Sequence, residues 1–201
     1  MKEKDEYRTL AAESRGLYKE KGSRFIGIAI PVSSVTDVRL NLDRLRKEYH
    51  DARHHCYAYR IGKEPFEYRY QDDGEPSGTA GKPIYGQIQS FDITNVLIVV
   101  IRYFGGIKLG TGGLIQAYKS SAKDALENGS IINKVWTSLV DIRFDYHQIN
   151  EVMKIIKAEN LKIVSQESTE VCRIVLEIRT GSLELIKNKL SLPEKVELTV
   201  I

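Results

Sequence analysis

The sequence predicts an α+β protein built from two domains, and three patterns carry that prediction. Segments in which apolar and polar residues alternate, as in half-buried strands, lie between segments with apolar residues at helical spacing. One continuous apolar run, residues 95–103, is rich in β-branched residues, which is typical of a strand covered on both faces. Beyond Ile131 the character of the sequence changes, and strand and helix patterns follow one another in a regular order.

The first domain, residues 1–130, is expected to open with a β-hairpin. Its alternating segments are residues 9–18 and 24–32, joined by the turn-like KEKGS. An amphipathic helix follows a Ser/Thr-type start, with its inner face at Val35, Val38, Leu42 and Leu45. The charged residues of this helix, Arg39, Arg44, Arg46 and Lys47, are interpreted as a solvated face.

The rest of this domain is expected to alternate between strands and helices. The predicted elements are a strand over 54–62, a short helix over 84–91, the buried strand 95–103 and a helix over 115–128. Gly129 supplies the stop of the last helix.

The second domain, residues 131–201, shows the order strand, helix, strand, strand, helix, strand. The first strand covers KVWTSLVDIRFDY, and the last is KVELTV. This βαββαβ order predicts a ferredoxin-like domain.

Composition indicates a cytoplasmic protein with a mildly basic first domain. The chain has 201 residues, of which 42% are hydrophobic and 28% charged, and no apolar run is long enough to span a membrane. Its start is charged where a signal peptide would be apolar. The net charge of +3 comes wholly from residues 1–130, which permits contact with a phosphate backbone. Cys56 and Cys172 are far apart in strand-like runs, so no disulfide-linked partner is expected.

Two glycine-rich loops stand out, DDGEPSGTAGKP from Asp72 and RYFGGIKLGTGGL from Arg102. The second lies between a buried strand and a helix, where backbone N–H groups can hold an anion. Gly110, Thr111, Gly112 and Gly113 are the candidate residues, although tight turns explain glycines equally well. Pro76 and Pro83 occupy positions that a nucleotide P-loop needs for other residues, so that motif is excluded.

The first loop also carries an acidic group with two hydroxyls: Asp72, Asp73, Glu75, Ser77 and Thr79. Such oxygens can bind Mg²⁺ or Ca²⁺, but the EF-hand spacing is absent, and helix capping is the plainer role. We therefore predict no metal and no cofactor. His54 and His55 should point to opposite faces of their strand, so only one can serve a given site, and a pair with Asp72 or Asp73 is favoured over zinc.

A set of cations mixed with aromatic rings suits a phosphate backbone with stacked bases. The candidate nucleic-acid-binding residues are Arg24, Arg53, Arg102, Lys108 and Lys119. Phe25, Tyr57, Tyr103 and Phe104 lie among them.

Four ordered motifs, KGSRFIG, DARHHCYAYRIG, DDGEPSGTAGKP and VVIRYFGGIKLGTGGLIQAY, closely resemble the YigZ/IMPACT family between Lys21 and Leu126. The resemblance implies a first domain with the fold of a small-subunit ribosomal protein and of domain IV of elongation factor G, including an unusual left-handed βαβ crossover. It implies a second domain similar to domain V of that factor. Eukaryotic relatives regulate translation, whereas the family supplies no catalytic residues to carry over.

Three functions remain open at this point, and the third of them is a protein-interaction module. The leading hypothesis is a cytosolic binding protein that contacts RNA or the ribosome and modulates translation. The alternative is an enzyme acting on a phosphorylated small molecule or nucleotide, with phosphate at Gly110–Gly113, Asp72 or Asp73 as metal ligand or base, and His54 or His55 transferring protons. The expected functional surface is the same in the first two cases, namely the two glycine-rich loops with Arg53, His54 and His55 alongside.

Overall fold

The computed structural model describes residues 5–191 and 196–201. The elements are, in order, β1 (Glu6–Leu10), β2 (Ser14–Glu20), β3 (Ser23–Pro31), α1 (Val35–Glu48), β4 (His54–Ile61), β5 (Glu67–Gln71), α2 (Gly81–Ser90), β6 (Val96–Tyr103), α3 (Thr111–Glu127), β7 (Ile131–Val135), β8 (Thr137–Asp145), η1 (Tyr146–Gln148), α4 (Ile149–Ala158), β9 (Lys162–Ser168), β10 (Val171–Arg179), η2 (Thr180–Ser182), α5 (Leu183–Leu190) and β11 (Glu197–Val200). No helix in these described ranges has the length and apolarity needed to cross a membrane.

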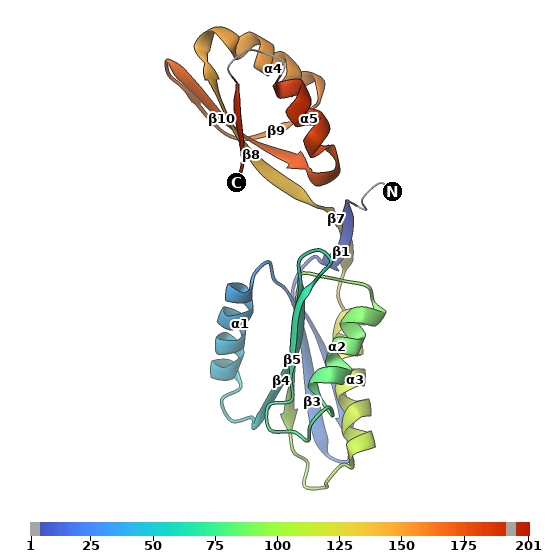
Figure 1. Ribbon diagram of the computed structural model, residues 1–201. Helices are drawn as coiled ribbons and strands as arrows, with labels where there is room; N and C mark the ends of the chain where they lie inside the picture. Colours follow the sequence, from blue (N-terminus) through green and yellow to red (C-terminus); the bar gives the residue numbers. More distant parts are fainter. Residues whose placement is uncertain (1–4, 192–195) are drawn as a thin grey trace. The chain divides into compact units, whose positions relative to one another are not determined.

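The chain divides into two compact units (Figure 1). The N-terminal unit is residues 8–134, and the C-terminal unit is the rest of the described chain. The boundary expected from the sequence, after Ser130, lies just before this division. β1 and β7 pair with each other in a two-stranded sheet.

The predicted hairpin is present as β2 and β3, which pair from Ser14↔Ala29 to Glu20↔Ser23. Lys21 and Gly22 connect the strands with φ of 46° and 78°, as in the two-residue turns that match strand twist. The first strand of this hairpin was wrongly expected to span 9–18. Thr9 and Leu10 belong to β1 instead, and Ala11 leaves the strand to donate its N–H to the Ser130 carbonyl.

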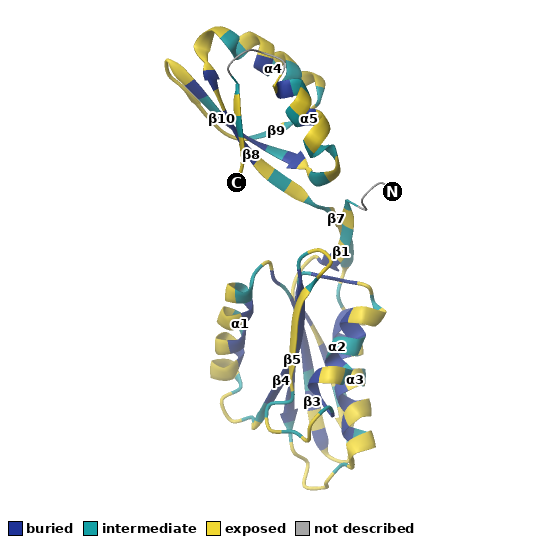
Figure 2. Cartoon of the chain, in the orientation of Figure 1, coloured by how far each residue is buried: buried dark blue, intermediate teal, exposed yellow. Residues whose placement is uncertain are grey.

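A five-stranded sheet in the order β2-β3-β6-β4-β5 forms the centre of the N-terminal unit, and all its neighbours are antiparallel. The prediction of a strand covered on both faces is confirmed for β6, which is buried along almost its whole length. Figure 2 shows the helix α1 buried on its side toward the sheet and exposed on its outer side. Leu97, Val99 and Ile101 belong to one hydrophobic core, whereas Ile98 and Val100 belong to the other.

Helices cover both faces of this sheet. α1 begins at a capping box, in which the Ser34 hydroxyl accepts from Asp37 N at 3.1 Å, and it packs Val38, Leu42 and Leu45 on one face. α2 and α3 cover the opposite face (Figure 1). The α1 prediction is therefore confirmed, with the expected inner face.

The topology requires one left-handed crossover. β3 and β4 are parallel and are joined through α1 on one face, while β5 and β6 are parallel and are joined through α2 on the other. The two connections differ in three ways. They cross the sheet in opposite directions, the strands that they join run in opposite directions, and they pass over opposite faces of the sheet. Three reversals give the opposite hand, so one of the two crossovers must be of the rare left-handed kind.

The C-terminal unit has the predicted ferredoxin-like arrangement. β8, α4, β9, β10, α5 and β11 follow the βαββαβ order, and the antiparallel sheet has the order β11-β8-β10-β9. The strand expected over KVWTSLVDIRFDY is interrupted at Trp136, whose N–H donates to the Asp5 carbonyl at 2.7 Å. The Trp136 ring stacks on Tyr7, with 4.0 Å between the ring centroids.

Candidate functional site

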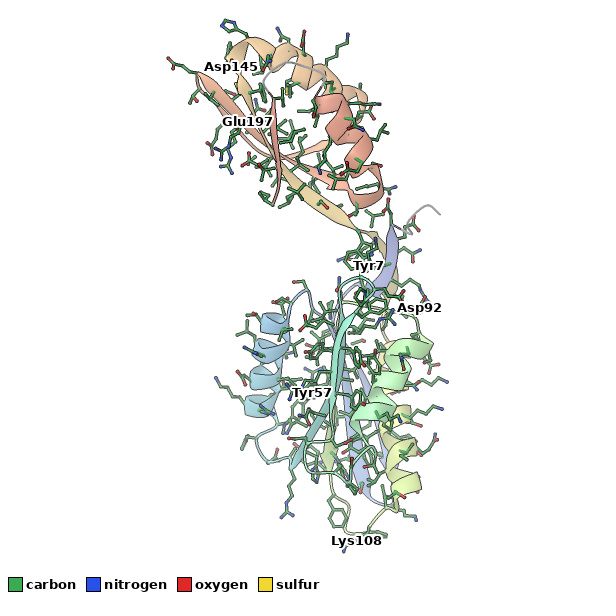
Figure 3. All side chains as sticks on the ribbon, in the orientation of Figure 1. Tyr7, Tyr57, Asp92, Lys108, Asp145 and Glu197 are labelled. Atoms are coloured by element: carbon green, nitrogen blue, oxygen red, sulfur yellow. The ribbon has the colours of Figure 1, made fainter. Side chains whose placement is uncertain are left out.

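Most of the candidate residues lie at one end of the five-stranded sheet. We call this the loop end and define it as residues 21–24, 50–54, 72–80 and 102–113. Because β5 and β6 are parallel, the loops that follow them leave the sheet at the same end. The register places Arg24 opposite Tyr103, and Arg102 opposite His54. Lys108 marks this end in Figure 3.

Asp72 organises the first glycine-rich loop. One carboxylate oxygen accepts from Gly78 N at 2.8 Å, and the other accepts from Ala80 N at 3.0 Å and Gly81 N at 2.8 Å. The last two donors are at the start of α2, so the carboxylate caps that helix from outside. The capping interpretation of this acidic loop is confirmed for Asp72.

Glu75 and Arg102 form a buried ion pair behind the loop. Their side chains are 4% and 8% exposed, and Nη1 of Arg102 lies 2.6 Å from Oε1 of Glu75. The same oxygen accepts from the Tyr118 hydroxyl at 2.7 Å. The Arg102 guanidinium also lies 5.4 Å from the ring centroid of Phe25. Arg102 is therefore an interior residue, and its charge is matched by Glu75.

Tyr118 connects Glu75 to Cys56, because the Tyr118 hydroxyl also lies 3.3 Å from the Cys56 Sγ. Burial raises the pKa of Tyr118 and also that of Cys56. Both groups consequently stay protonated near neutral pH. A thiol held in this form is a weak nucleophile.

The two histidines meet the loop through its backbone. His54 Nδ1 is 2.9 Å from the Asp73 carbonyl oxygen, and the His55 N–H donates to the Asp73 carboxylate at 2.6 Å. The expected bond between a histidine ring and a loop carboxylate is thus replaced by two contacts that use main-chain atoms. Burial is the main cause that lowers the pKa of His55, and the Asp73 carboxylate opposes it.

The second glycine-rich loop joins β6 to α3. Gly105 lies so close to the hairpin turn that a Cβ would overlap the backbone of Gly22 and Ser23. α3 begins at Thr111, earlier than the expected 115, so Gly112 and Gly113 lie in its first turn. Gly110 is the N-cap residue and supplies no side-chain cap. The first N–H groups of α3 are therefore not covered by a capping side chain.

The remaining candidates differ in exposure. Ser77 is exposed, whereas Thr79 is buried and donates to the Pro76 carbonyl at 2.6 Å. Lys119 is exposed on α3 beyond its first turns. Of the proposed nucleic-acid-binding residues, Arg24, Arg53 and Lys108 are exposed at the loop end.

An aromatic and apolar group accompanies these cations. Arg24 lies 5.1 Å from the ring centroid of Tyr103, and Phe104 and Ile107 are each 57% exposed. Sequence reasoning identified Phe104 but missed Ile107, which the motif FGGIKLG could have suggested because it places an apolar residue among glycines. It predicted the helix that holds Tyr118 but missed the bond of that residue to Glu75.

Metal ligation finds little support at the loop end. Among the described residues, no group of three His, Cys, Asp or Glu side chains could hold a metal ion. Asp72 already accepts three backbone N–H groups, and Glu75 is bound to Arg102.

Comparison with known proteins finds relatives in the IMPACT family. Residues 21–126 match the Impact N-terminal domain. The chain is 33% identical over 186 residues to an IMPACT family member of Haemophilus influenzae, covering 90% of each chain, and 34% identical to the IMPACT family member YigZ of Escherichia coli, covering 73% of each. It is 38% identical to Protein IMPACT of Xenopus laevis over 96 residues, which are 45% of this chain and 30% of that protein. The crystal structure of a hypothetical protein matches with a TM-score of 0.74 and 28% identity over 98% of each chain.

Proposed function

Because the chain belongs to the IMPACT family, we propose that it is a cytoplasmic binding protein that contacts RNA or the ribosome through the loop end and modulates translation. The observation that carries the proposal is a cluster of exposed cations beside an exposed aromatic ring. Arg24, Arg53 and Lys108 are exposed there, and among the described residues none of them has an ion-pair partner. Phe104, in the same loop as Lys108, is 57% exposed.

This arrangement fits the chemistry of a single-stranded or looped RNA. Arginine and lysine bind phosphate oxygens, and an exposed ring such as Phe104 gives a base a surface to stack on. The first turn of α3 adds backbone N–H groups and the positive end of a helix dipole. Gly110 and Gly112 favour close approach, because a Cβ at either position would meet no atom within 4 Å.

Binding is favoured over catalysis at this surface because the acidic residues that the enzyme hypothesis needs already have structural partners. Asp72 caps α2, and Glu75 neutralises buried Arg102. The Asp73 carboxylate accepts from the His55 backbone N–H. None of the three is arranged as a free base or metal ligand beside the first turn of α3.

Anisotropy titrations of a fluorescently labelled single-stranded RNA, together with ribosome co-sedimentation, test this proposal. We expect Phe104→Ala and Lys108→Ala to weaken binding, by about 1–3 kcal/mol for the loss of a stacking ring. The matched controls are Leu40→Ala, an exposed apolar residue of α1, and Lys134→Ala, an exposed lysine of β7. Undetectable binding at low salt, or equal losses in the control variants, would refute a role for the loop end.

A further inference from the structure

A second surface, separate from the loop end, lies on the α1 face of the same sheet. A cavity of about 320 Å³ opens between α1 and strands β4 and β5. Tyr57 and Tyr59 form its floor from β4, Arg69 borders it from β5, and Arg39, Asp43 and Arg46 line it from α1. Figure 3 labels Tyr57 in the layer between the sheet and α1. Its volume is near the lower end of the range for small-molecule sites, about 300–1,000 Å³.

The geometry of the elements brings three guanidinium groups to this cavity. Arg39 and Arg46 are seven residues apart on α1, two helical turns, and so lie on one side of that helix. Arg69 is directly opposite Tyr59 in the β4–β5 ladder, and directly opposed residues project from the same face of a sheet. The sequence analysis interpreted Arg39 and Arg46 as part of a solvated face. In the structure, both also line one cavity together with Arg69.

The charges of these three arginines are not matched one for one by acidic side chains around the cavity. None of them forms an ion pair or a hydrogen bond in the described part of the chain. The third arginine of α1 behaves differently from Arg39 and Arg46: Arg44 pairs with Glu13 at 2.6 Å and with Glu48 at 3.5 Å. Asp43 is the single acidic group lining the cavity, which leaves an excess of two positive charges. The hydroxyls of Tyr57 and Tyr59 also have no hydrogen-bond partner among the described residues, so both are free to donate.

We propose that this cavity binds a small molecule that carries phosphate, about the size of a pyrophosphate or a mononucleotide. Planar guanidinium groups bind phosphate oxygens in a bidentate way, and two tyrosine hydroxyls beneath them supply further donors. The excess of two positive charges matches a phosphate dianion. A pocket of this limited volume suits a free phosphate ester, whereas a nucleic-acid strand needs a groove that continues along its backbone.

Calorimetric titration of the full-length chain with inorganic pyrophosphate, and separately with AMP, tests the proposal. We expect saturable binding of one molecule of at least one probe, weakened about tenfold by Arg46→Ala and by Arg69→Ala, because each removes a charge-assisted pair. Asp43→Asn should tighten binding severalfold, because it removes the one opposing charge. Lys47→Ala, an exposed cation of α1 outside the cavity, should leave binding unchanged.

Several results would overturn this assignment. These are no heat of binding from either probe, an effect of Lys47→Ala as large as that of Arg46→Ala, or a response of the arginine variants to single-stranded RNA alone. Arg69 lies on an exposed edge strand, so its variant keeps the test valid if Arg46→Ala fails to fold. RNA binding through Phe104 and Lys108 should be unaffected by Arg69→Ala, which separates this proposal from that for the loop end.

Discussion

Glu75 is a candidate acid by sequence, but in the structure it has a structural role, since it pairs with a buried arginine. It lies in an acidic, glycine-rich loop, yet its carboxylate is buried and binds Arg102 and Tyr118 at 2.6 and 2.7 Å. A buried ion pair adds little to the folding stability compared with an apolar pair of similar volume. The loss of one partner is nevertheless costly, because it leaves the other charge buried and unpaired. The residues that we propose for binding at the loop end are therefore its exposed cations and Phe104.

Replacing Glu75 by Gln should destabilise the protein by about 3 kcal/mol, because Arg102 would keep its charge in the interior without an anion. Urea unfolding measures this free energy. Glu67→Gln on the exposed strand β5 is the matched control and should change the stability by less than about 0.5 kcal/mol. Equal stabilities of the two variants would contradict the importance of the buried pair.

His55 predicts a pH dependence of stability. Burial lowers its pKa below the ordinary value of about 6.5, so in the window just below that value the unfolded chain binds a proton that the folded chain does not. Stability should therefore fall as the pH decreases from about 7 toward 5. Thermal midpoints across this range should show a smaller slope for His55→Gln than for the wild type. His147→Gln, at an exposed position, should keep the wild-type slope.

Among the elements, the connection from β6 to α3 depends on close backbone packing. Gly105→Ala should destabilise the fold by about 1–3 kcal/mol, because the new Cβ would overlap backbone atoms of Gly22 and Ser23. Backbone atoms cannot move aside as the end of a flexible side chain can. Gly112→Ala is the control, since a Cβ there meets no atom within 4 Å and the position is helical. Chemical denaturation of both variants checks this, and a loss at Gly112 as large as that at Gly105 would contradict it.

Elements with a strong periodic signal could be predicted from the sequence, and elements without one could not. β6 is a continuous apolar run, and α1 has both an apolar face and a capping box. β5 has no such signal, because it is an exposed edge strand whose Tyr68 and Tyr70 pack on the single ring of Tyr85. The first turn of α3 was missed because Gly112 and Gly113 carry no side chains to show helical spacing.

At the scale of the whole molecule, the βαββαβ order was enough to predict the ferredoxin-like unit, whose sheet order follows from that connectivity. The candidate site was harder, because its residue types were visible while their partners were not. The sequence shows that Arg102 and Lys108 are both cations, but only the fold buries the first against Glu75 and exposes the second. The arginines of the α1 face were missed for the same reason, since their cavity forms between elements far apart in the sequence.

The most direct test of RNA contact at the loop end is the salt dependence of binding. For the wild type, the logarithm of the association constant for single-stranded RNA should fall linearly with the logarithm of salt concentration, with a slope of about −0.7 for each phosphate contacted. The combined variant Arg24→Ala, Arg53→Ala, Lys108→Ala should lose about 0.7 of that slope for each contact removed. Lys134→Ala should keep the full slope. A triple variant with the affinity and slope of the wild type would contradict the account.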